Sequence, residues 1–526
     1  MVDSSVEFFA PQDLLRAPLS GVNSATYDTA QVLLQTQVRP DRFGDSLAAD
    51  ATALLLRTRN GDGSWGAQQW PVRYRMVPTL AAVSALAGTS FTEAAATAVR
   101  DGVGYLRRHA TAMAPRAQPD LVASEFIVPA LWEHLAHLIS TEPRNTVIGN
   151  WSLGDRDALG RFARHILQVC GSDRARLHRL REAHDIGRAT PPYVVHSLEL
   201  LADTAAEGPW THAVPVGCSA AATAAVAARS RLPRPDAVDL LQRQARVLDG
   251  GFPVIMRMEA FELLWVCGVL VRSAIPIPEP VRREWISWIR GVLTPDGVCA
   301  GPGVPPDGDD TAAALYLLGR LERSAVSPDP LLRFVMNDGC ASTPGERTRS
   351  TTATAHALEA LGLWVNQNPD GCPLYRRAHA SLMQYLIETQ NDEGAWDDKW
   401  HASPFYATGC AVLALRRYGG QPGCEAVQRA VDWARESQNT DGSWGIWAAT
   451  LEETAMALDI LSACPNAGEA RRHGAAFLNA HHDAQAGSSL RPPLWHGKEL
   501  YDPHRIVRTI IDAARAAHRP RPGASQ

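Results

Sequence analysis

Three aspartates that lie within four residues, Asp307, Asp309 and Asp310, have the clearest capacity for chemistry in this sequence. They follow a Pro- and Gly-rich loop and open the apolar segment 311–319. Carboxylates this close repel one another when ionised, so we expect one of them to keep its proton near neutral pH. Burial at the end of an apolar cavity would strengthen this effect. The cluster therefore predicts a Brønsted acid able to protonate an alkene.

Two other roles are open to the same acids. A single carboxylate often caps a helix N-terminus, where it accepts hydrogen bonds from free backbone N–H groups. A calcium loop is the second alternative, but the oxygen ligands that would follow in an EF-hand pattern are missing. Capping accounts for one aspartate and leaves the crowding of three unexplained, which favours the acid.

The elements that must position these acids are helices. Apolar residues recur at helical spacing almost throughout the chain, as in "TLAAVSALAG" and "EETAMALDILSA". Alternating β-branched patterns typical of strands are almost absent, and the predicted helices end at Gly or Pro. The sequence therefore predicts an all-α protein with short connections.

The connections between these helices repeat. Acid–Gly turns recur every 42 to 55 residues between Asp249 and Gly442, and two of them are nearly identical: "QNDEGAW" at 390–396 and "QNTDGSW" at 438–444. A third copy, "NGDGSWG", occupies residues 60–66. One helical hairpin per repeat predicts an α/α barrel, and the chain is long enough for two. For the turn tryptophans we favour a structural role.

Composition limits the function. The chain has 526 residues, with 51 basic and 56 acidic side chains, so its near-balanced charge argues against a nucleic-acid partner. No apolar run is long enough for a membrane helix, and the N-terminal region has no signal-peptide pattern. Nine cysteines without a C-x-x-C pair favour reduced thiols in a cytoplasmic protein. Monomer and homodimer both stay open.

Together these motifs resemble the bacterial class II terpene cyclases that act on prenyl diphosphates. The resemblance rests on D-x-D-D in "PDGDDTAAAL", on the tryptophan turns, and on "TAHALEAL" (354–361), "SPFYAT" (403–408), "EETAMAL" (452–458) and "WHGKELYDPHRIVR" (495–508). It implies two α/α barrels in a βγ arrangement. Residues 1–35 and 280–526 would form the barrel that carries the acid, and 36–279 would be an inserted barrel.

The resemblance also assigns roles to residues. Asp309 corresponds to the general acid, with Asp307 and Asp310 orienting it and tuning its proton affinity. By motif, His356 and Tyr406 are expected close to that acid, although an ordinary helix-face histidine is an equal alternative for His356.

A substrate that keeps its diphosphate needs a cationic or metal clamp. Lys498 is one of only two lysines in the chain, and it lies in a motif that resembles the family. A compact ammonium suits a phosphate. We assign Arg505, Arg508 and Trp65 to the same diphosphate site, and Asp62 to a Mg²⁺ ion. A solvated basic helix face and a plain turn aspartate are the respective alternatives.

The expected reaction begins by protonation. Class I terpene synthases ionise the diphosphate with D-D-x-x-D, but here Asp397 and Asp398 are followed by His401 where the third acid belongs. The resemblance therefore implies cyclisation of a linear prenyl diphosphate to a bicyclic product that retains the diphosphate. Geranylgeranyl diphosphate is favoured over farnesyl diphosphate, which would give a drimane-type product. A non-catalytic α/α toroid that binds a lipid or peptide is the other alternative.

Overall fold

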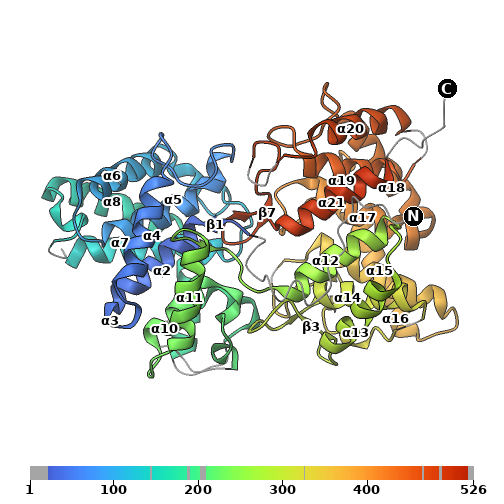
Figure 1. The fold of residues 1–526 in the computed structure, drawn as a ribbon, viewed down its shortest axis with the longest axis horizontal. Helices are drawn as coiled ribbons and strands as arrows, with labels where there is room; N and C mark the ends of the chain where they lie inside the picture. The colour runs from blue at the N-terminus through green and yellow to red at the C-terminus, as the bar shows by residue number, and fades with distance from the viewer. Residues whose placement is uncertain are drawn as a thin grey trace.

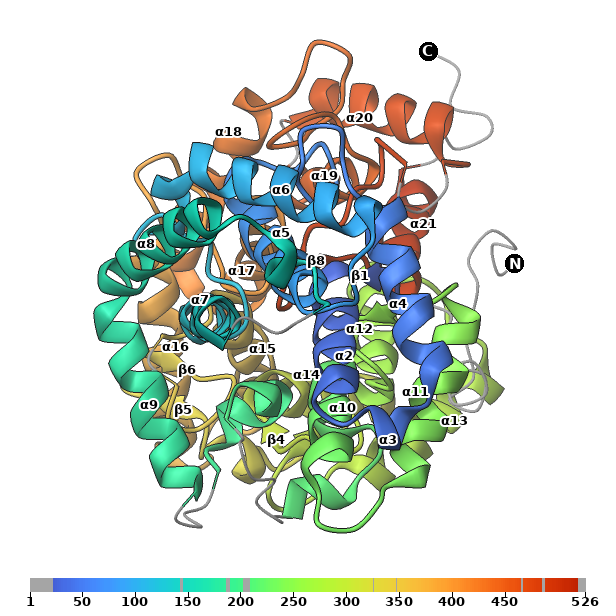
Figure 2. The same ribbon diagram turned by 90° about the vertical axis from the view of Figure 1, so that its left-hand side faces the viewer.

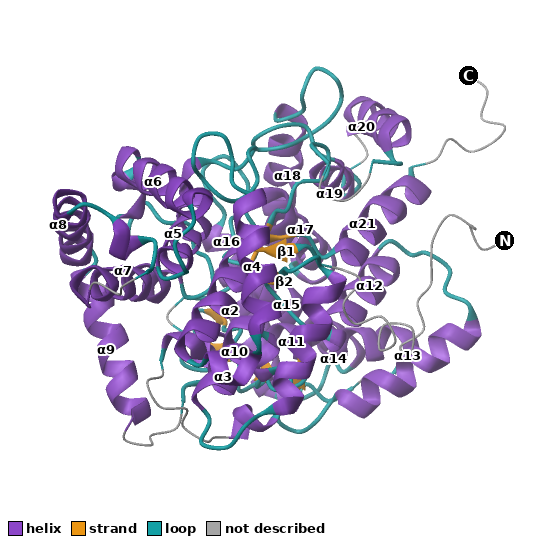
Figure 3. Cartoon of the chain, turned by 60° about the vertical axis from the view of Figure 1, so that its left-hand side comes forward, coloured by secondary structure: helices purple, strands orange, loops and turns teal. Residues whose placement is uncertain are grey.

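The structure, a computed structural model, describes residues 22–141, 145–185, 190–201, 209–324, 326–346, 348–464, 467–484 and 488–518. Helices dominate these residues, and the strands are short two-residue pairs (Figure 3). The prediction of an all-α chain is confirmed. No helix of the described residues has both the length and the apolar character needed to cross a membrane.

The first barrel contains the helices between residues 26 and 247. They are α2 (Thr26–Val38), α3 (Pro40–Phe43), α4 (Asp45–Arg57), α5 (Val72–Ala87), α6 (Glu93–Arg108), α7 (Ser124–Thr141), α8 (Leu153–Val169), α9 (Gly171–Asp185), η3 (Pro192–Leu200), α10 (Ala220–Arg229) and α11 (Pro235–Val247). Contacts run from α2 to α5, α7, η3, α10 and back to α2, which closes an inner ring. The remaining long helices pack outside it (Figure 2).

The second barrel contains the helices between residues 259 and 517. They are α12 (Glu259–Arg272), α13 (Glu279–Val292), α14 (Gly308–Glu322), α15 (Thr351–Gln367), α16 (Pro373–Thr389), α17 (Pro404–Tyr418), α18 (Gly420–Glu436), α19 (Leu451–Leu461), α20 (Gly468–His481) and α21 (His504–Ala517). The inner ring runs α12, α14, α15, α17, α19, α21 and closes on α12, with α13, α16, α18 and α20 outside. Figure 1 shows the two barrels side by side.

Short strand pairs brace the loops at the barrel ends. β1 (Ser24–Ala25) pairs with β2 (Phe252–Pro253), and β3 (Val298–Cys299) with β4 (Pro306–Asp307). β5 (Val335–Met336) pairs with β6 (Gly339–Cys340), and β7 (Trp495–His496) with β8 (Leu500–Tyr501). All four pairs are antiparallel. The β7–β8 hairpin belongs to the second barrel and reaches the space between the two (Figure 1).

The barrel boundary differs from the predicted one. Helix α2, whose residues up to 35 were expected in the acid-bearing barrel, packs on α4, α5 and α10 in the first barrel. Helix α12, expected in the inserted barrel, closes the inner ring of the second. The boundary therefore lies between β2 and α12 rather than at residue 279. Residues 1–21, expected to complete the second barrel, lie outside the described residues.

The tryptophan turns are structural. Trp65, Trp396 and Trp444 are fully buried. Each indole N–H donates to a backbone carbonyl ten residues earlier in the chain, at 2.7 Å. Each backbone N–H donates at 3.0 Å to a threonine hydroxyl in the next inner helix. A buried indole needs such a partner, so each turn fixes one outer helix against the inner helix that follows.

Candidate active site

The acid cluster begins at the N-terminus of α14. Asp307 is the N-cap residue, and its Oδ1 accepts the backbone N–H of Asp310 at 2.8 Å. The next residue must be small, because a Cβ atom on Gly308 would lie 2.4 Å from the Ala341 carbonyl oxygen. The capping role considered for these acids is therefore real, but it belongs to Asp307 alone.

The other two aspartates point away from bulk water. The exposed fraction is 8% for Asp309 and 3% for Asp310. Burial, together with the nearby Asp307 charge, raises the pKa of Asp310 well above its usual range. Burial also raises the pKa of Asp307, to about 7. Two buried carboxyl groups with raised pKa values therefore flank Asp309, and burial is a larger cause of these shifts than the repulsion between the acids.

His356 on α15 contacts Asp309 directly. Its Nδ1 atom lies 2.6 Å from Asp309 Oδ1, and its exposed fraction is 4%. Burial alone would lower the pKa of this imidazole, but the Asp309 charge outweighs it and raises the pKa to about 10. An imidazole N–H donated to Oδ1 leaves Oδ2 as the oxygen that can carry a transferable proton.

Aromatic rings surround the cavity beside the acid. The Tyr406 hydroxyl accepts the indole N–H of Trp265 at 2.6 Å. The ring of Tyr406 lies 4.7 Å from that of Trp495, and the ring of Trp265 lies 4.6 Å from that of Phe261. We call Phe261, Trp265, Tyr406 and Trp495 the aromatic wall. Such rings stabilise a cation on their faces by roughly 0.5–2 kcal/mol each.

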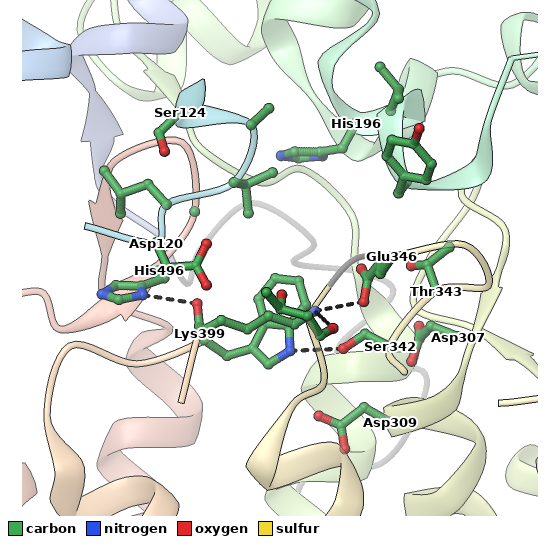
Figure 4. Close-up of a pocket in the computed structure, with 18 of the residues that line it drawn as sticks. Asp120, Ser124, His196, Asp307, Asp309, Ser342, Thr343, Glu346, Lys399 and His496 are labelled. Carbon is green, nitrogen blue, oxygen red and sulfur yellow. Dashed lines mark hydrogen bonds and ion pairs between the residues drawn. The ribbon is translucent and has the colours of Figure 1, made fainter. Parts of the chain in front are cut away.

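A cavity of about 860 Å³ lies between the barrels and includes Asp307, Asp309, Asp310 and the whole aromatic wall in its lining. The first barrel contributes residues 115–126 and 192–196, and the second contributes the loops at 342–348 and 399–400 and the β7–β8 hairpin. Figure 4 shows Asp309 and His196 at opposite ends of the view, with Ser342, Glu346 and Lys399 between them. The acid thus lines the cavity between the barrels.

The cavity also has a charged region, which sequence reasoning missed. Lys399 Nζ pairs with Glu346 Oε2 at 2.6 Å, and Arg116 and Arg176 of the first barrel line the same cavity. The backbone carbonyl of Lys399 accepts the Nδ1–H of His496 at 2.9 Å (Figure 4). The available signal was that Lys399 is one of only two lysines in the chain.

Lys498, the predicted diphosphate ligand, lies elsewhere. It is fully buried and is not among the lining residues. Its Nζ lies 2.8 Å from Glu199 Oε1 and 3.7 Å from Asp28 Oδ1, and it donates to Ser219 Oγ at 2.7 Å. These partners belong to the first barrel. The ammonium therefore neutralises buried acids and joins the two barrels, which leaves it unable to meet a substrate.

The other predicted phosphate and metal residues also lie away from the cavity lining. Arg505 Nη1 lies 3.1 Å from Glu262 Oε1, and Arg508 Nε lies 2.8 Å from Asp512 Oδ2 on the same helix. Asp62 accepts from Ser64 and from Arg75 at the outer turn that Trp65 anchors. The structure corrects these assignments, because each of these side chains is bound to a structural partner away from the cavity.

His196 is a further cavity residue that sequence reasoning missed. It lines the cavity, and its Nδ1–H donates to the Gly217 carbonyl oxygen at 2.7 Å. That bond fixes the tautomer and leaves Nε2 as the nitrogen with a lone pair. Burial lowers the pKa of His196 to about 3. The ring is therefore neutral at ordinary pH, and only a strongly acidic species can protonate it.

Comparisons with known proteins agree with this site. Residues 348–480 match the family described as the squalene-hopene cyclase C-terminal domain. The labda-7,13-dienyl diphosphate synthase of Streptomyces clavuligerus is 35% identical over 94% of this chain and 89% of its own length. The ent-copalyl diphosphate synthase of Streptomyces sp. strain KO-3988 is also 35% identical, over 96% of this chain and 94% of its own.

A solved structure of a relative has the same fold. The ent-copalyl diphosphate synthase from Streptomyces platensis superposes with a TM-score of 0.80 at 32% identity, covering 97% of this chain and 98% of that one. Both barrels therefore have counterparts in a single relative. The resemblance inferred from the motifs is confirmed, and the chain is an enzyme that belongs to the class II terpene cyclases, the family of the copalyl diphosphate synthases.

Proposed function

We propose that this enzyme cyclises geranylgeranyl diphosphate to a bicyclic diphosphate, with Asp309 as the acid that starts the reaction. One observation carries the proposal: a buried carboxyl, held by His356, lines a cavity that also has an aromatic wall and cationic side chains. An acid, an apolar chamber and an anion-binding region are the three parts that protonation of a prenyl diphosphate needs.

In the reactive form the proton held by the Asp309–His356 pair lies on Asp309 Oδ2, and His356 is neutral. The first step breaks this O–H bond and forms a C–H bond at the terminal alkene. The alkene electrons make the new bond, and a tertiary cation is left on the neighbouring carbon. His356, as a positioning residue, donates to Oδ1 and stabilises the carboxylate that forms. The next alkenes attack in turn and close two rings. Because the cavity pre-folds the chain, each alkene already lies near the cation that it attacks.

The reaction ends when the last cation loses a proton. We assign this step to His196, which lines the same cavity as Asp309 and has its lone pair on Nε2. The low pKa of His196, about 3, is no obstacle, since a carbocation is a far stronger acid than an imidazolium with that pKa. The C–H electrons form the product alkene, and the proton passes to Nε2 and later to water.

The diphosphate end of the substrate would lie against Lys399, Arg116 and Arg176, the Lys and Arg side chains that line the cavity among the described residues. Lys399 pairs with Glu346 in the free enzyme, so an arriving diphosphate would compete for the ammonium. Charge-assisted contacts to phosphate oxygens are among the stronger hydrogen bonds in proteins. The diphosphate is bound and not cleaved, because the reaction needs no ionisation at that end.

We propose that Mg²⁺ binds only together with the diphosphate. The described residues hold no group of three His, Cys, Asp or Glu side chains arranged for a metal ion. Asp120 and Glu125 are cavity carboxylates that would hold an ion jointly with phosphate oxygens, the usual coordination of Mg²⁺. A bound ion would neutralise phosphate charge. Chelation with EDTA should raise KM more than it lowers kcat, and added Mg²⁺ should restore KM.

The substrate's length is inferred from the relatives. Copalyl and labdadienyl diphosphates are C20 bicyclic diphosphates, and enzymes named for these products match this chain along almost its full length. This favours geranylgeranyl over farnesyl diphosphate. It also disfavours the non-catalytic toroid, since these two relatives are named as enzymes and the acid cluster is intact.

The test is a product assay. The purified enzyme is incubated with geranylgeranyl or farnesyl diphosphate and Mg²⁺, the products are dephosphorylated, and the alcohols are identified by gas chromatography and mass spectrometry. We expect a bicyclic C20 alcohol and a loss of at least about 100-fold in turnover for Asp309→Asn. Asp296→Asn, which changes an exposed carboxylate, is the control and should be fully active. Equal turnover by Asp309→Asn would overturn the assignment of the acid, and a cyclic C15 product alone would overturn the substrate.

A further inference from the structure

A buried carboxylate stands behind the aromatic wall, outside the acid cluster. Glu452 lies in the first turn of α19, and its exposed fraction is 2%. Its Oε1 atom accepts the indole N–H of Trp495 at 2.8 Å and lies 3.3 Å from His401 Nε2. Glu452 itself does not line the cavity, whereas Trp495 does. It can therefore act on the reaction only through the rings that it holds.

The proton positions follow from a second hydrogen bond to His401. The backbone N–H of Ser403 donates to His401 Nδ1 at 3.0 Å, so Nδ1 is an acceptor and Nε2 carries the proton. Glu452 thus receives two ring N–H donors on one oxygen. Its place in the first turn of a helix adds the favourable field of the helix N-terminus. These contacts compensate a buried negative charge that would otherwise be costly.

The two rings bound by Glu452 have centroids 5.3 Å apart, and both contact the ring of Tyr406. The ring of Tyr406 lies 4.7 Å from that of Trp495 and 5.1 Å from that of His401. Trp495 also lies 6.0 Å from Phe261. Along the wall, Trp265 lies 5.4 Å from His356, the partner of Asp309, and donates to Tyr406. At the other end, Trp495 is followed in the chain by His496, which contacts the backbone of Lys399. Trp495 therefore lies between the acid and the proposed diphosphate region.

We propose that Glu452 is a positioning residue that holds Trp495 against the substrate and makes its indole ring more electron-rich. A carboxylate on the indole N–H increases the negative charge on the ring face, which strengthens a cation–π contact. From its position in the aromatic wall, Trp495 stabilises the cation that forms when the first ring closes. Glu452 forms no bond to substrate and exchanges no proton. The inference rests on the proposed cyclisation.

The neighbouring Glu453 provides a matched control. It is fully buried, and its two oxygens accept from the Ser403 hydroxyl, the Ile446 backbone N–H and the Thr450 hydroxyl. It therefore stabilises the loop and the start of α19, and none of these hydrogen bonds involves a ring of the aromatic wall. Glu453→Gln and Glu452→Gln make the same chemical change at adjacent positions, but only the second changes what Trp495 contacts.

The experiment compares kcat, KM, product distribution and melting temperature for the wild type, Glu452→Gln, Glu453→Gln and Trp495→Phe with geranylgeranyl diphosphate. For Glu452→Gln we expect about a tenfold fall in kcat, with KM within about twofold of wild type, since the loss concerns only the cationic states. Monocyclic products released after one ring closure should rise. Trp495→Phe, which keeps a ring but removes the N–H, should show the same products more weakly.

The outcomes separate the possible failures. Glu453→Gln should lower the melting temperature and leave the product ratio unchanged. A Glu452→Gln enzyme with wild-type kcat and products would overturn the inference while leaving the cyclase function intact. If Glu452→Gln does not fold, Trp495→Phe decides: an unchanged product ratio rejects the role of the indole N–H. A wild type without turnover would instead reject the proposed function, and this inference with it.

Discussion

The Nδ1 atom of His356 lies 2.6 Å from the Oδ1 atom of Asp309, and both side chains are buried. The two residues come from α14 and α15, adjacent helices of the inner ring. The start of α15 is fixed in turn by Asp398, whose Oδ1 accepts the backbone N–H of Thr351 at 2.7 Å. The acid is therefore oriented by a helix whose own N-terminus is tied to the next repeat.

The first prediction concerns His356→Phe. Losing the donor to Oδ1 should lower kcat by about 100-fold, a usual size for losing assistance to proton transfer. Because the pKa of His356 is raised from 6.5 to about 10, its contribution to stability is complete below pH 6.5 and is lost as the pH rises towards 10. The difference in melting temperature between wild type and variant should therefore shrink over that interval.

The control for this prediction is His473→Phe, which changes an exposed histidine on α20. Its kcat should be unchanged. A His356→Phe enzyme with normal kcat would show that Asp309 needs no partner on α15. A stability difference independent of pH would contradict the charged contact itself.

The second prediction concerns Asp307→Asn. Burial raises the pKa of this carboxyl from 3.8 to about 7, so its contribution to stability is complete below pH 3.8 and is lost as the pH rises through 7. Asparagine stays neutral and can still accept the Asp310 backbone N–H as an N-cap. The variant should gain stability relative to wild type between pH 5 and pH 8, measured by thermal melts. Parallel curves for the two proteins would contradict a buried, late-ionising Asp307.

The acid was predictable from sequence because the information is local. Asp307, Asp309 and Asp310 are neighbours in the chain, and their crowding is visible without a structure. His356 required the family resemblance, since it meets Asp309 only when α14 and α15 pack together. The partners of Lys498 could not be inferred at all: Asp28 and Glu199 reach it from α2 and η3 of the other barrel.

The fold was predictable for the same reason, but the boundary between the two barrels was not. The tryptophan turns repeat in sequence and each makes the same hydrogen bonds in space. The sequences of helices α2 and α12 contain no such motif. Each has an apolar surface that either ring would accept, and tertiary contacts with α5, α10, α14 and α21 decide their barrels. Similarly, nothing local distinguishes Lys399, which lines the cavity, from Lys498, which does not.

The third prediction concerns Lys399→Met. Removing the ammonium from the cavity should raise KM for geranylgeranyl diphosphate by about tenfold or more, the size of one charge-assisted contact to phosphate. The melting temperature should also fall, because the side chains of Lys399 and Glu346 are only 10% and 14% exposed and the change leaves the Glu346 carboxylate without its cation. Lys399→Arg keeps the charge and should recover part of the affinity. An unchanged KM for Lys399→Met would place the diphosphate elsewhere.

The fourth prediction concerns Lys498→Met, the matched change at the only other lysine. It leaves Asp28 and Glu199 buried without their cation, and breaking such a pair costs about 3–5 kcal/mol. Burial already raises the pKa of Asp28 to about 7 even though Lys498 opposes the shift. Without the lysine, Asp28 takes up its proton at still higher pH. The stability difference from wild type should therefore be small at pH 5 and grow towards pH 8.

Two measurements separate this structural role from a role in substrate binding. Thermal melts at pH 5 and pH 8 should show the growing gap, and Glu199→Gln added to Lys498→Met should recover part of the lost stability, because one buried charge is removed. At a temperature where Lys498→Met is folded, its KM should stay near that of wild type, in contrast to Lys399→Met. A raised KM with an unchanged melting temperature would return Lys498 to the diphosphate site and would contradict the position that its contacts give it.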